Sequence, residues 1–448
     1  MSTPQQESGR KRKRRRPVFA EPAAIISAER ENYVPLRRAD VVDLLCGRPE
    51  LDADESQALR GLCEQLARFV HLEYHASLEH VKDAYAPFEP DRDTVTAAAK
   101  LDEQQRDEKL TELWSELGWL LERANYNRLD RQDIEDVLHV ASDWGVRVDV
   151  DLDVLDRLEV YARGSVTTVR TRRRLWNYYR PEEVQTPTFQ RLVVVFRVRD
   201  HKRLQLFSDP QAVYLKLFKN IPHTDLEMLL PGTRPKMRWH DRGKVIVPIA
   251  SGVGVTVTKL LKLGAVAVFA GIYGMLAFGA LVVGTIGYGL RSFHGYQKAL
   301  QRYQLQLSQS LYFQNLGHNA GVLAHLLDEA EEQECREMML AYYFLWKRAP
   351  ETGFTREELD RQVEAFLEEV TGRPVDFEVA DALDKLRRLK LVEDVQSGDG
   401  AVYAVPLEQA AAQLHKAWDN LSATGIPSPT LLAPRIHTAD QSHSRQVG

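Results

Sequence analysis

The feature that most constrains this chain is a run of 28 residues, from Leu263 to Leu290, that contains no charged side chain. About 20 consecutive apolar residues are enough to cross a bilayer as a helix. The run also contains seven glycines, which would weaken a helix in water but are tolerated in membranes, where small residues let helices pack closely. The sequence therefore predicts a membrane-spanning segment rather than a buried helix of a soluble core.

The number of crossings is a separate question. The apolar sequence already begins near residue 245, so residues 245 to 290 are long enough for two tight crossings. Basic residues flank both ends, and such flanks tend to lie on the same side of a membrane, which favours a hairpin. Lys259 and Lys262 favour the alternative of a single crossing, because a lysine near the middle of a bilayer costs about 3 kcal/mol.

Charge and cysteine content describe the rest of the chain. The formal net charge of -5 conceals seven consecutive basic residues, Arg10 to Arg16, in a segment that has too little apolar area to fold alone. This tail is expected to be a disordered, solubilising segment, with contact to anionic lipid or nucleic acid as the alternative. The three cysteines have no metal-like spacing and form an odd set, so we expect no disulfide framework.

Hydrophobic periodicity divides the chain into helical and mixed regions. Apolar residues recur every three or four positions from Leu59 to Tyr74, as in an amphipathic helix. Residues 158–172, 189–200 and 212–218 are rich in β-branched residues and read as strands. The expected fold class is a membrane-anchored α+β protein. Its expected parts are a basic tail (1–19), a helical region (20–152), an α+β membrane-proximal domain (153–244), the transmembrane segment (245–290), a helical connector (291–334), a winged-helix-like domain (335–420) and a disordered tail (421–448).

Two Ser/Thr-x-x-Glu spacings mark expected helix starts. Thr355 and Glu358 open a helix in the winged-helix-like domain, which ends in a predicted hairpin with its turn at residues 397–400. Thr224 and Glu227 have the same spacing and predict a short helix that Pro231 and Gly232 end. The leucines of this helix are expected to face either the domain core or a bilayer interface.

Basic residues surround that short helix just before the apolar run. A basic cluster beside a membrane segment suits anionic headgroups, so the sequence predicts lipid contact there. The candidate residues are Lys216, Lys219, Arg234, Lys236, Arg238, Arg242 and Lys244.

Catalytic and metal-binding motifs give little support for an enzyme. His71, His75 and Glu79, with Glu73 between them, have a spacing that could place ligands on one helical face. No partner motif accompanies them, so a solvated surface is the preferred reading, and we assign no metal, cofactor or catalytic residue. The chain contains no glycine-rich phosphate loop, HExxH or GxSxG sequence.

The charges of the winged-helix-like domain indicate what kind of partner it binds. The expected helix and the residues just before it carry both charges. The basic residues are Lys385, Arg387, Arg388 and Lys390, and the acidic residues are Asp376, Glu378, Asp381 and Asp384. Mixed charge of this kind favours protein binding over the reading of DNA, which needs a basic surface. An unidentified protein partner is therefore expected in addition to the membrane, and a nucleic-acid partner is not.

Four long blocks resemble a family known as domain of unknown function 3754, which includes the transmembrane protein 143-like proteins of animals. The blocks are residues 31–45, 71–91, 214–237 and 310–345. The resemblance covers about residues 25 to 405. It implies membrane attachment through a two-pass segment and, for the animal member, a mitochondrial setting. It implies no reaction and no catalytic residues.

These observations lead to one expected function and two alternatives. The chain is expected to be a membrane-anchored, non-enzymatic interaction or scaffold protein. Its soluble parts are expected in the cytosol at a bacterial cytoplasmic membrane, with a mitochondrial membrane as the alternative. The alternatives in function are a membrane-surface enzyme acting on lipid or peptide and a membrane-tethered regulator that binds nucleic acid.

Overall fold

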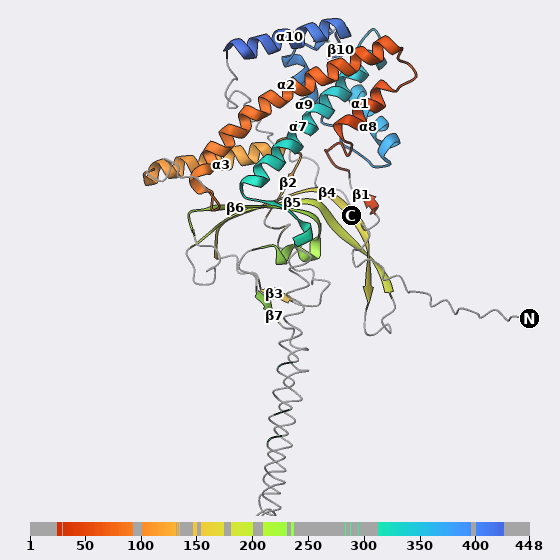
Figure 1. The fold of residues 1–448 in the computed structure, drawn as a ribbon. Coiled ribbons are helices and arrows are strands. Elements are labelled where there is room, and N and C mark those ends of the chain that lie inside the picture. The colour runs from red at the N-terminus through yellow and green to blue at the C-terminus, as the bar shows by residue number, and fades with distance from the viewer. Residues whose placement is uncertain are drawn as a thin grey trace, which may run out of the picture.

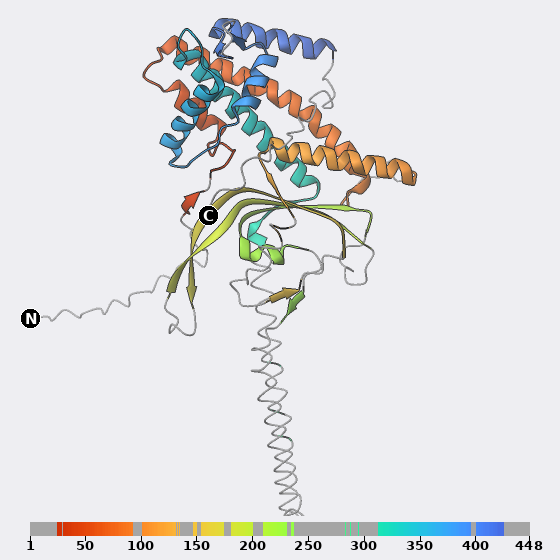
Figure 2. The ribbon, with the colours of Figure 1, turned by 180° about the vertical axis from the view of Figure 1, so that it is seen from behind.

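The computed structural model describes residues 25–28, 30–92, 101–130, 132, 134, 147–149, 154–173, 181–199, 209–230, 234–236, 283, 287, 294, 312–395 and 400–424. These residues form a layer of helices over a curved antiparallel sheet (Figure 1). The view from behind shows the helices on the same face of the sheet (Figure 2). The combination of helices and strands agrees with the α+β part of the predicted fold class.

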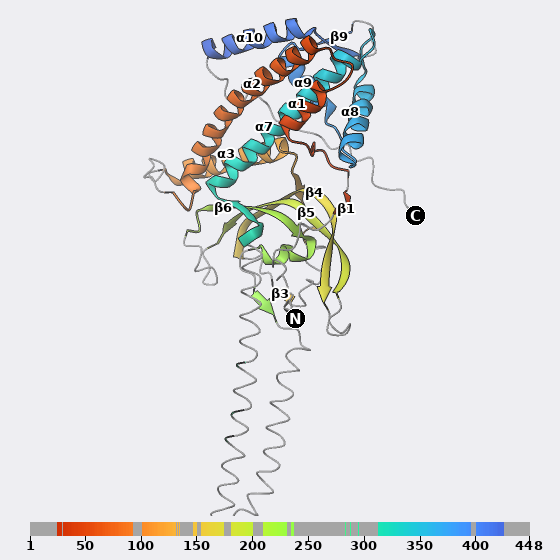
Figure 3. The ribbon, with the colours of Figure 1, turned by 45° about the vertical axis from the view of Figure 1, so that its right-hand side comes forward.

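The helical layer comes from both ends of the chain. Its α-helices are α1 (Arg38–Cys46), α2 (Ala53–Tyr85), α3 (Glu103–Arg123), α7 (Ala320–Tyr343), α8 (Arg356–Thr371), α9 (Val379–Arg388) and α10 (Leu407–Thr424). A 3-10 turn, η1 (Ala86–Phe88), follows α2, and a π-helical turn, η7 (Phe344–Arg348), follows α7. α7 lies between α2 and α9 and contacts both, so it forms the centre of the layer (Figure 3).

Local sequence explains where three of these helices begin. The side chain of Thr355 accepts a hydrogen bond from the backbone of Glu358, whose carboxylate accepts one from the backbone of Thr355. This is the capping box that the sequence predicted for α8. Asp52 with Glu55 and Asp102 with Gln105 form the same arrangement at α2 and α3. Each box provides partners for two backbone N–H groups that the first turn leaves free.

The sheet runs in the order β1-β4-β5-β6-β8, with β2 also paired to β4. Its strands are β1 (Ile25–Ala28), β2 (Asn127–Leu129), β4 (Leu155–Arg173), β5 (Pro181–Val198), β6 (Val213–Pro222) and β8 (Asn315–His318). All the pairings are antiparallel. Two separate two-stranded antiparallel pairs, β3 (Arg147–Asp149) with β7 (Arg234–Lys236) and β9 (Val392–Asp394) with β10 (Val402–Ala404), complete the described strands.

Both faces of the central sheet are apolar. Side chains alternate along a strand, and on β5 Val193 and Val195 pack into the core beneath the helices, whereas Val194 and Phe196 belong to a second core on the opposite face. This explains the uninterrupted apolar run in β5, because a strand covered on both sides needs no polar face. The first core joins residues from Val34 to Leu414, so the helices before and after the sheet pack as one body.

The short helix expected at Thr224 takes a different form. The structure has a 3-10 turn, η6 (His223–Met228), which begins after Pro222 without a side-chain cap. The predicted helix start with Thr224 as its cap is therefore wrong, because the turn begins one residue earlier, at His223. Leu226 and Leu230 are 0% and 2% exposed and pack into the second core. Of the two environments left open for these leucines, the structure places them in the domain core.

The membrane-anchored fold class requires correction. Within the described ranges, no helix is both long enough and apolar enough to cross a membrane. α2 has 33 residues, but charged side chains occur along its whole length, and α7 carries glutamates at its centre. This finding contradicts the predicted transmembrane segment and the location in a bacterial or mitochondrial membrane. The apolar run itself, residues 245–290, lies outside the described residues except for Val283 and Gly287.

Candidate functional site

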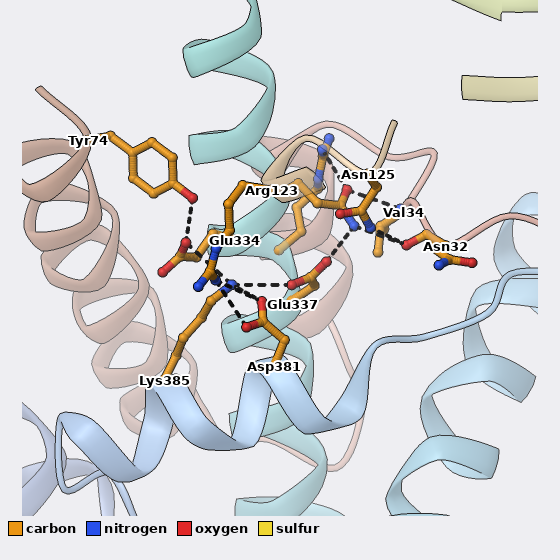
Figure 4. Close-up of polar contacts among 11 residues, drawn as sticks. Asn32, Val34, Tyr74, Arg123, Asn125, Glu334, Glu337, Asp381 and Lys385 are labelled. Atoms are coloured by element: carbon orange, nitrogen blue, oxygen red, sulfur yellow. Dashed lines mark hydrogen bonds and ion pairs between the residues drawn. The ribbon is translucent and has the colours of Figure 1, made fainter. Parts of the chain in front are cut away.

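Four helices meet around a set of charged side chains that lie between them (Figure 4). This buried charge cluster comprises Tyr74 from α2, Arg123 from α3, Glu334 and Glu337 from α7, and Asp381 and Lys385 from α9. The side chains of Lys385, Glu334 and Glu337 are only 8%, 6% and 2% exposed. Charges removed from water to this extent are stable only when they are paired and hydrogen-bonded.

Lys385 is the centre of the cluster. Its Nζ lies 3.3 Å from Oε2 of Glu334 and 3.6 Å from Oε2 of Glu337, and it also forms a short ion pair with Asp381. Glu334 and Glu337 are three residues apart on α7, and Asp381 and Lys385 are four apart on α9, so each pair shares one helical face. Helix periodicity thus places three carboxylates around one ammonium group.

Neighbouring groups complete the hydrogen bonding. Arg123 donates to both carboxylate oxygens of Asp381, at 3.0 and 3.2 Å. The hydroxyl of Tyr74 donates to Glu334 at 2.5 Å, and the side-chain amide of Gln333 donates to Glu337 at 2.7 Å. Each carboxylate of the cluster therefore has a donor in addition to Lys385.

The cluster contains more acids than bases, and this excess changes its protonation. Burial raises the pKa of Glu337 to about 7, with smaller contributions from Asp381 and Glu378, while Lys385 acts in the opposite direction. Burial alone would lower the pKa of Lys385, but Glu334, Glu337 and Asp381 outweigh it and raise that pKa. Lys385 therefore stays an ammonium ion, and Glu337 exchanges its proton near neutral pH.

A second polar layer fastens the N-terminal segment beside the cluster. The amide of Asn125 donates to the carbonyl of Asn32 at 2.6 Å, and the backbone N–H of Val34 donates to Gln333 at 3.2 Å (Figure 4). On the other side, Arg388 of α9 donates to Glu73 of α2 at 2.8 Å. These contacts link the N-terminal segment, the turn after α3 and α2 to α7 and α9.

A cleft of about 690 Å³ opens beside the cluster, between the end of α3, the start of α8 and one side of α9. Its acidic lining residues are Glu122, Asp360, Asp376, Glu378, Asp381 and Asp384. Its basic lining residues are Arg123, Arg356, Lys385 and Arg388. The lining thus has an excess of carboxylates, and Arg123 and Lys385 are already paired within the buried charge cluster.

Two carboxyl groups of the cleft show the effect of this excess. Burial, followed by the neighbouring Glu364 and Asp376, raises the pKa of Asp360 to about 6. Burial, with Asp381 as a further contribution, raises the pKa of Glu378. Carboxylates with raised pKa values gain stability when a cation approaches. The cleft is therefore suited to a positively charged ligand.

The lining is less suited to nucleophilic catalysis. Among the described residues that line the cleft there is no serine, threonine, cysteine or histidine. The amine of Lys385 is held in its protonated form, and a nucleophilic amine must lose its proton. The geometry favours binding over covalent chemistry at this position.

Comparison with known protein families gives a match to a part of the chain that does not line the cleft. Residues 189–321 match the family model described as "Protein of unknown function (DUF3754)". Over this range, less than half of the chain, the sequence is similar to the DUF3754 family. The resemblance noted from the sequence is confirmed over this part of the chain. No solved structure matches the chain.

The DUF3754 match and the cleft occupy different parts of the fold. The match begins in β5, includes β6 and β8, and ends at the start of α7. The residues that line the cleft lie before and after this range. Arg191, inside the match, pairs with Glu329 of α7 at 3.3 Å, and Arg163 of β4 pairs with the same carboxylate at 2.9 Å. The DUF3754 region therefore contacts the central helix of the site through Arg191, beside the contact that Arg163 makes from outside the match.

The seven residues predicted to contact lipid headgroups lie in or near the DUF3754 region. Lys216 and Lys219 are half-buried on β6, and Arg234 and Lys236 are the end residues of β7. The positions of Arg238, Arg242 and Lys244 lie outside the described residues. Contact between these residues and anionic lipid stays a prediction.

The histidine set on α2 is divided among different partners. His71 Nδ1 lies 2.9 Å from Glu331, and the ring of His75 stacks on that of His71 with centroids 6.4 Å apart. Glu73 pairs with Arg388, and Glu79 pairs with Lys82 at 2.8 Å. The helix does bring these side chains to one region, but each carboxylate faces a residue outside the set.

The cysteines are free thiols in the structure. Cys46, Cys63 and Cys335 are all buried and unpaired with one another. Burial raises the pKa of Cys335 to about 12, and it raises the pKa of Cys63 further. Such thiols behave as small apolar groups of the core.

Sequence reasoning missed most of the buried charge cluster. Asp381 and Lys385 were noted only as part of a mixed-charge helix, and Tyr74 only as an apolar position. Glu334 and Glu337 received no role. A usable signal existed, since these two glutamates are spaced three residues apart among many apolar residues of α7.

Proposed function

We propose that this chain is a non-enzymatic interaction protein whose cleft between α3 and α9 binds a lysine- or arginine-rich segment of a partner protein. The observation that carries the proposal is the excess of carboxylates around the cleft, together with the raised pKa of Asp360 and of Glu378. A cationic side chain placed among them would reduce their mutual repulsion.

One contact within the chain illustrates this mode of binding. The guanidinium of Arg30 pairs with Glu364 at 2.5 Å and with Asp376 at 3.1 Å, at the edge of the cleft. Arg30 comes from the N-terminal segment, more than 300 residues away in sequence from both acids. An arginine from a separate chain would find similar partners elsewhere in the lining, at Glu122 and Asp360.

The charge of the cleft also separates this proposal from nucleic-acid binding. A nucleic-acid surface needs basic side chains that face phosphates and release counterions. Six carboxylates in the lining oppose an approaching phosphate. The lining residues Arg123 and Lys385 do not offset this opposition, because they are already paired with Asp381 and, for Lys385, also with Glu334 and Glu337.

Fluorescence anisotropy with labelled peptides tests the proposal. The full chain is titrated into a short peptide of alternating lysine and arginine, and separately into a glutamate-rich peptide of the same length. We expect binding of the basic peptide only, with an affinity that falls as salt is added. Equal binding of both peptides, or no binding of either, overturns the proposal.

A matched pair of variants locates the binding surface. Glu122→Gln with Asp360→Asn removes two charges from the cleft, and we expect the affinity to fall about tenfold, which corresponds to about 1.4 kcal/mol. Asp107→Asn with Glu108→Gln removes two charges from the exposed start of α3 and should leave the affinity unchanged. If the two double variants lose affinity equally, the attraction is general and the cleft is not the site.

A further inference from the structure

The buried charge cluster holds α9 in place with ionic contacts that depend on one proton. α9 supplies Lys385 and Asp381, and both side chains are bonded to groups on other helices. Lys385 bridges to Glu334 and Glu337 of α7, and Asp381 accepts two hydrogen bonds from Arg123 of α3. Movement of α9 away from α7 would therefore separate every one of these interhelical pairs.

The charges around Glu337 come from each helix that packs against it. α7 itself supplies Glu334 and the amide of Gln333, α9 and the residue before it supply Lys385, Asp381 and Glu378, α3 supplies Arg123, and α2 supplies Tyr74 and Glu73. Glu73 is balanced by Arg388. The remaining acids outnumber Lys385 and Arg123, so the cluster is negative when every carboxyl is ionised.

We propose that Glu337 is the proton-sensing group of a clamp that holds α9 against α7, closed when Glu337 is protonated and loosened when Glu337 is ionised. This inference concerns the regulation of the cleft and so rests on the proposed function, because α9 forms one wall of the cleft. The clamp itself is a property of the unliganded protein.

The direction of the effect follows from linkage. In the clamped state, burial raises the pKa of Glu337 from 4.5 to about 7. When α9 opens, water reaches the carboxyl and its pKa returns towards the ordinary value. The clamped state thus binds the proton more tightly, so it is favoured at low pH and loses stability as the pH rises through 7.

Hydrogen exchange of the unliganded full chain tests the clamp. Exchange of the amides of α9 is measured near pH 6 and near pH 8 and corrected for the intrinsic exchange rate at each pH. We expect the opening equilibrium of α9 in the wild-type protein to rise about tenfold between these values. An opening equilibrium of α9 that is the same at both pH values overturns the inference without any variant.

Two variants of α7 assign the effect to one carboxyl. Glu337→Gln keeps the shape and the contact with Gln333 but has no proton to lose, so the pH dependence of α9 opening should disappear. Glu331→Gln alters a carboxylate on the same helix that faces His71 and Arg38 instead, and it should retain the tenfold change. A pH dependence that survives in Glu337→Gln contradicts the inference.

These measurements contain no peptide, so their result is independent of whether the cleft binds a cationic segment. A pH-dependent α9 in a protein that binds no basic peptide would support the clamp and reject the proposed function. Peptide binding with a pH-independent α9 would do the reverse.

Discussion

Nζ of Lys385 lies 3.3 Å from Oε2 of Glu334, and the two side chains are 8% and 6% exposed. They belong to α9 and α7, and the two residues are about 50 positions apart along the chain. Burial of both charges is costly unless each keeps its partners. This pair therefore makes the docking of α9, which forms one wall of the cleft, dependent on the ionic contacts of Lys385.

Replacement of Lys385 by methionine should strongly destabilise the protein. The variant leaves Glu334, Glu337 and Asp381 without their shared cation, and breaking a buried pair costs about 3–5 kcal/mol. Urea unfolding measures the loss. Lys82→Met is the control, since Lys82 forms an exposed pair with Glu79 that solvent screens. Similar losses in the two variants would show that the cluster is not a stabilising unit.

Replacement of Asp360 by asparagine should change how stability depends on pH. The pKa of Asp360 is raised from 3.8 to about 6 by burial, Glu364 and Asp376. A raised carboxyl pKa stabilises the fold fully below 3.8, and this contribution is lost as the pH rises through 6. The stability of Asp360→Asn relative to wild type should therefore increase between pH 4 and pH 8 in urea unfolding. A constant difference would contradict the raised pKa.

Loss of the α8 capping box should have a moderate cost. Thr355→Ala removes the side chain that accepts from the backbone of Glu358, and such a change typically costs about 1 kcal/mol. Thr111→Ala is the control, because Thr111 is exposed within α3 and bonds only to the carbonyl of Asp107. We expect the control to stay within about 0.5 kcal/mol of wild type in thermal unfolding. Equal effects would show that the box adds nothing.

Two glycine-to-alanine substitutions should have opposite signs. Gly164 has a φ of +75°, and a Cβ there would lie 2.6 Å from Oε1 of Gln190, so Gly164→Ala should destabilise the fold by about 1–3 kcal/mol. Gly118 lies inside α3 with nothing within 4 Å of an added Cβ, so Gly118→Ala should stabilise it by about 0.5–1 kcal/mol. Thermal unfolding compares the two. A stable Gly164→Ala protein would show that Gln190 moves aside without cost.

Elements whose signal is local were predictable from the sequence. The periodicity around Leu59 to Tyr74 indicated α2, and the β-branched runs indicated β4, β5 and β6. The box of Thr355 and Glu358 was predicted because both partners lie within one helical turn. The start of η6 was predicted wrongly from the same motif at Thr224, since its leucines pack into the sheet core and the turn closes as a 3-10 helix after Pro222.

The strand β8 shows how pairing overrides local preference. Residues 315–318 lie in a stretch expected to be a helical connector, but they pair with β6 through Lys216 and His318. Strand pairing depends on a partner about 100 residues away, and no local pattern records that partner.

The expectation of an integral membrane protein rested on residues 245–290, and the helices that the structure does describe are amphipathic and carry charges.

The sequence by itself determined the helices and strands with strong periodicity, the capping box of α8, the mixed charge of α9 and the resemblance to the DUF3754 family. Each of these depends on residues close together in the chain or on long blocks of similarity. Only the tertiary structure decided that Tyr74, Arg123, Glu334 and Lys385 meet in one cluster. Their separation in sequence reaches about 300 residues. The free energy and protonation of a charged side chain depend on its burial and its partners, which are set only when distant segments pack together.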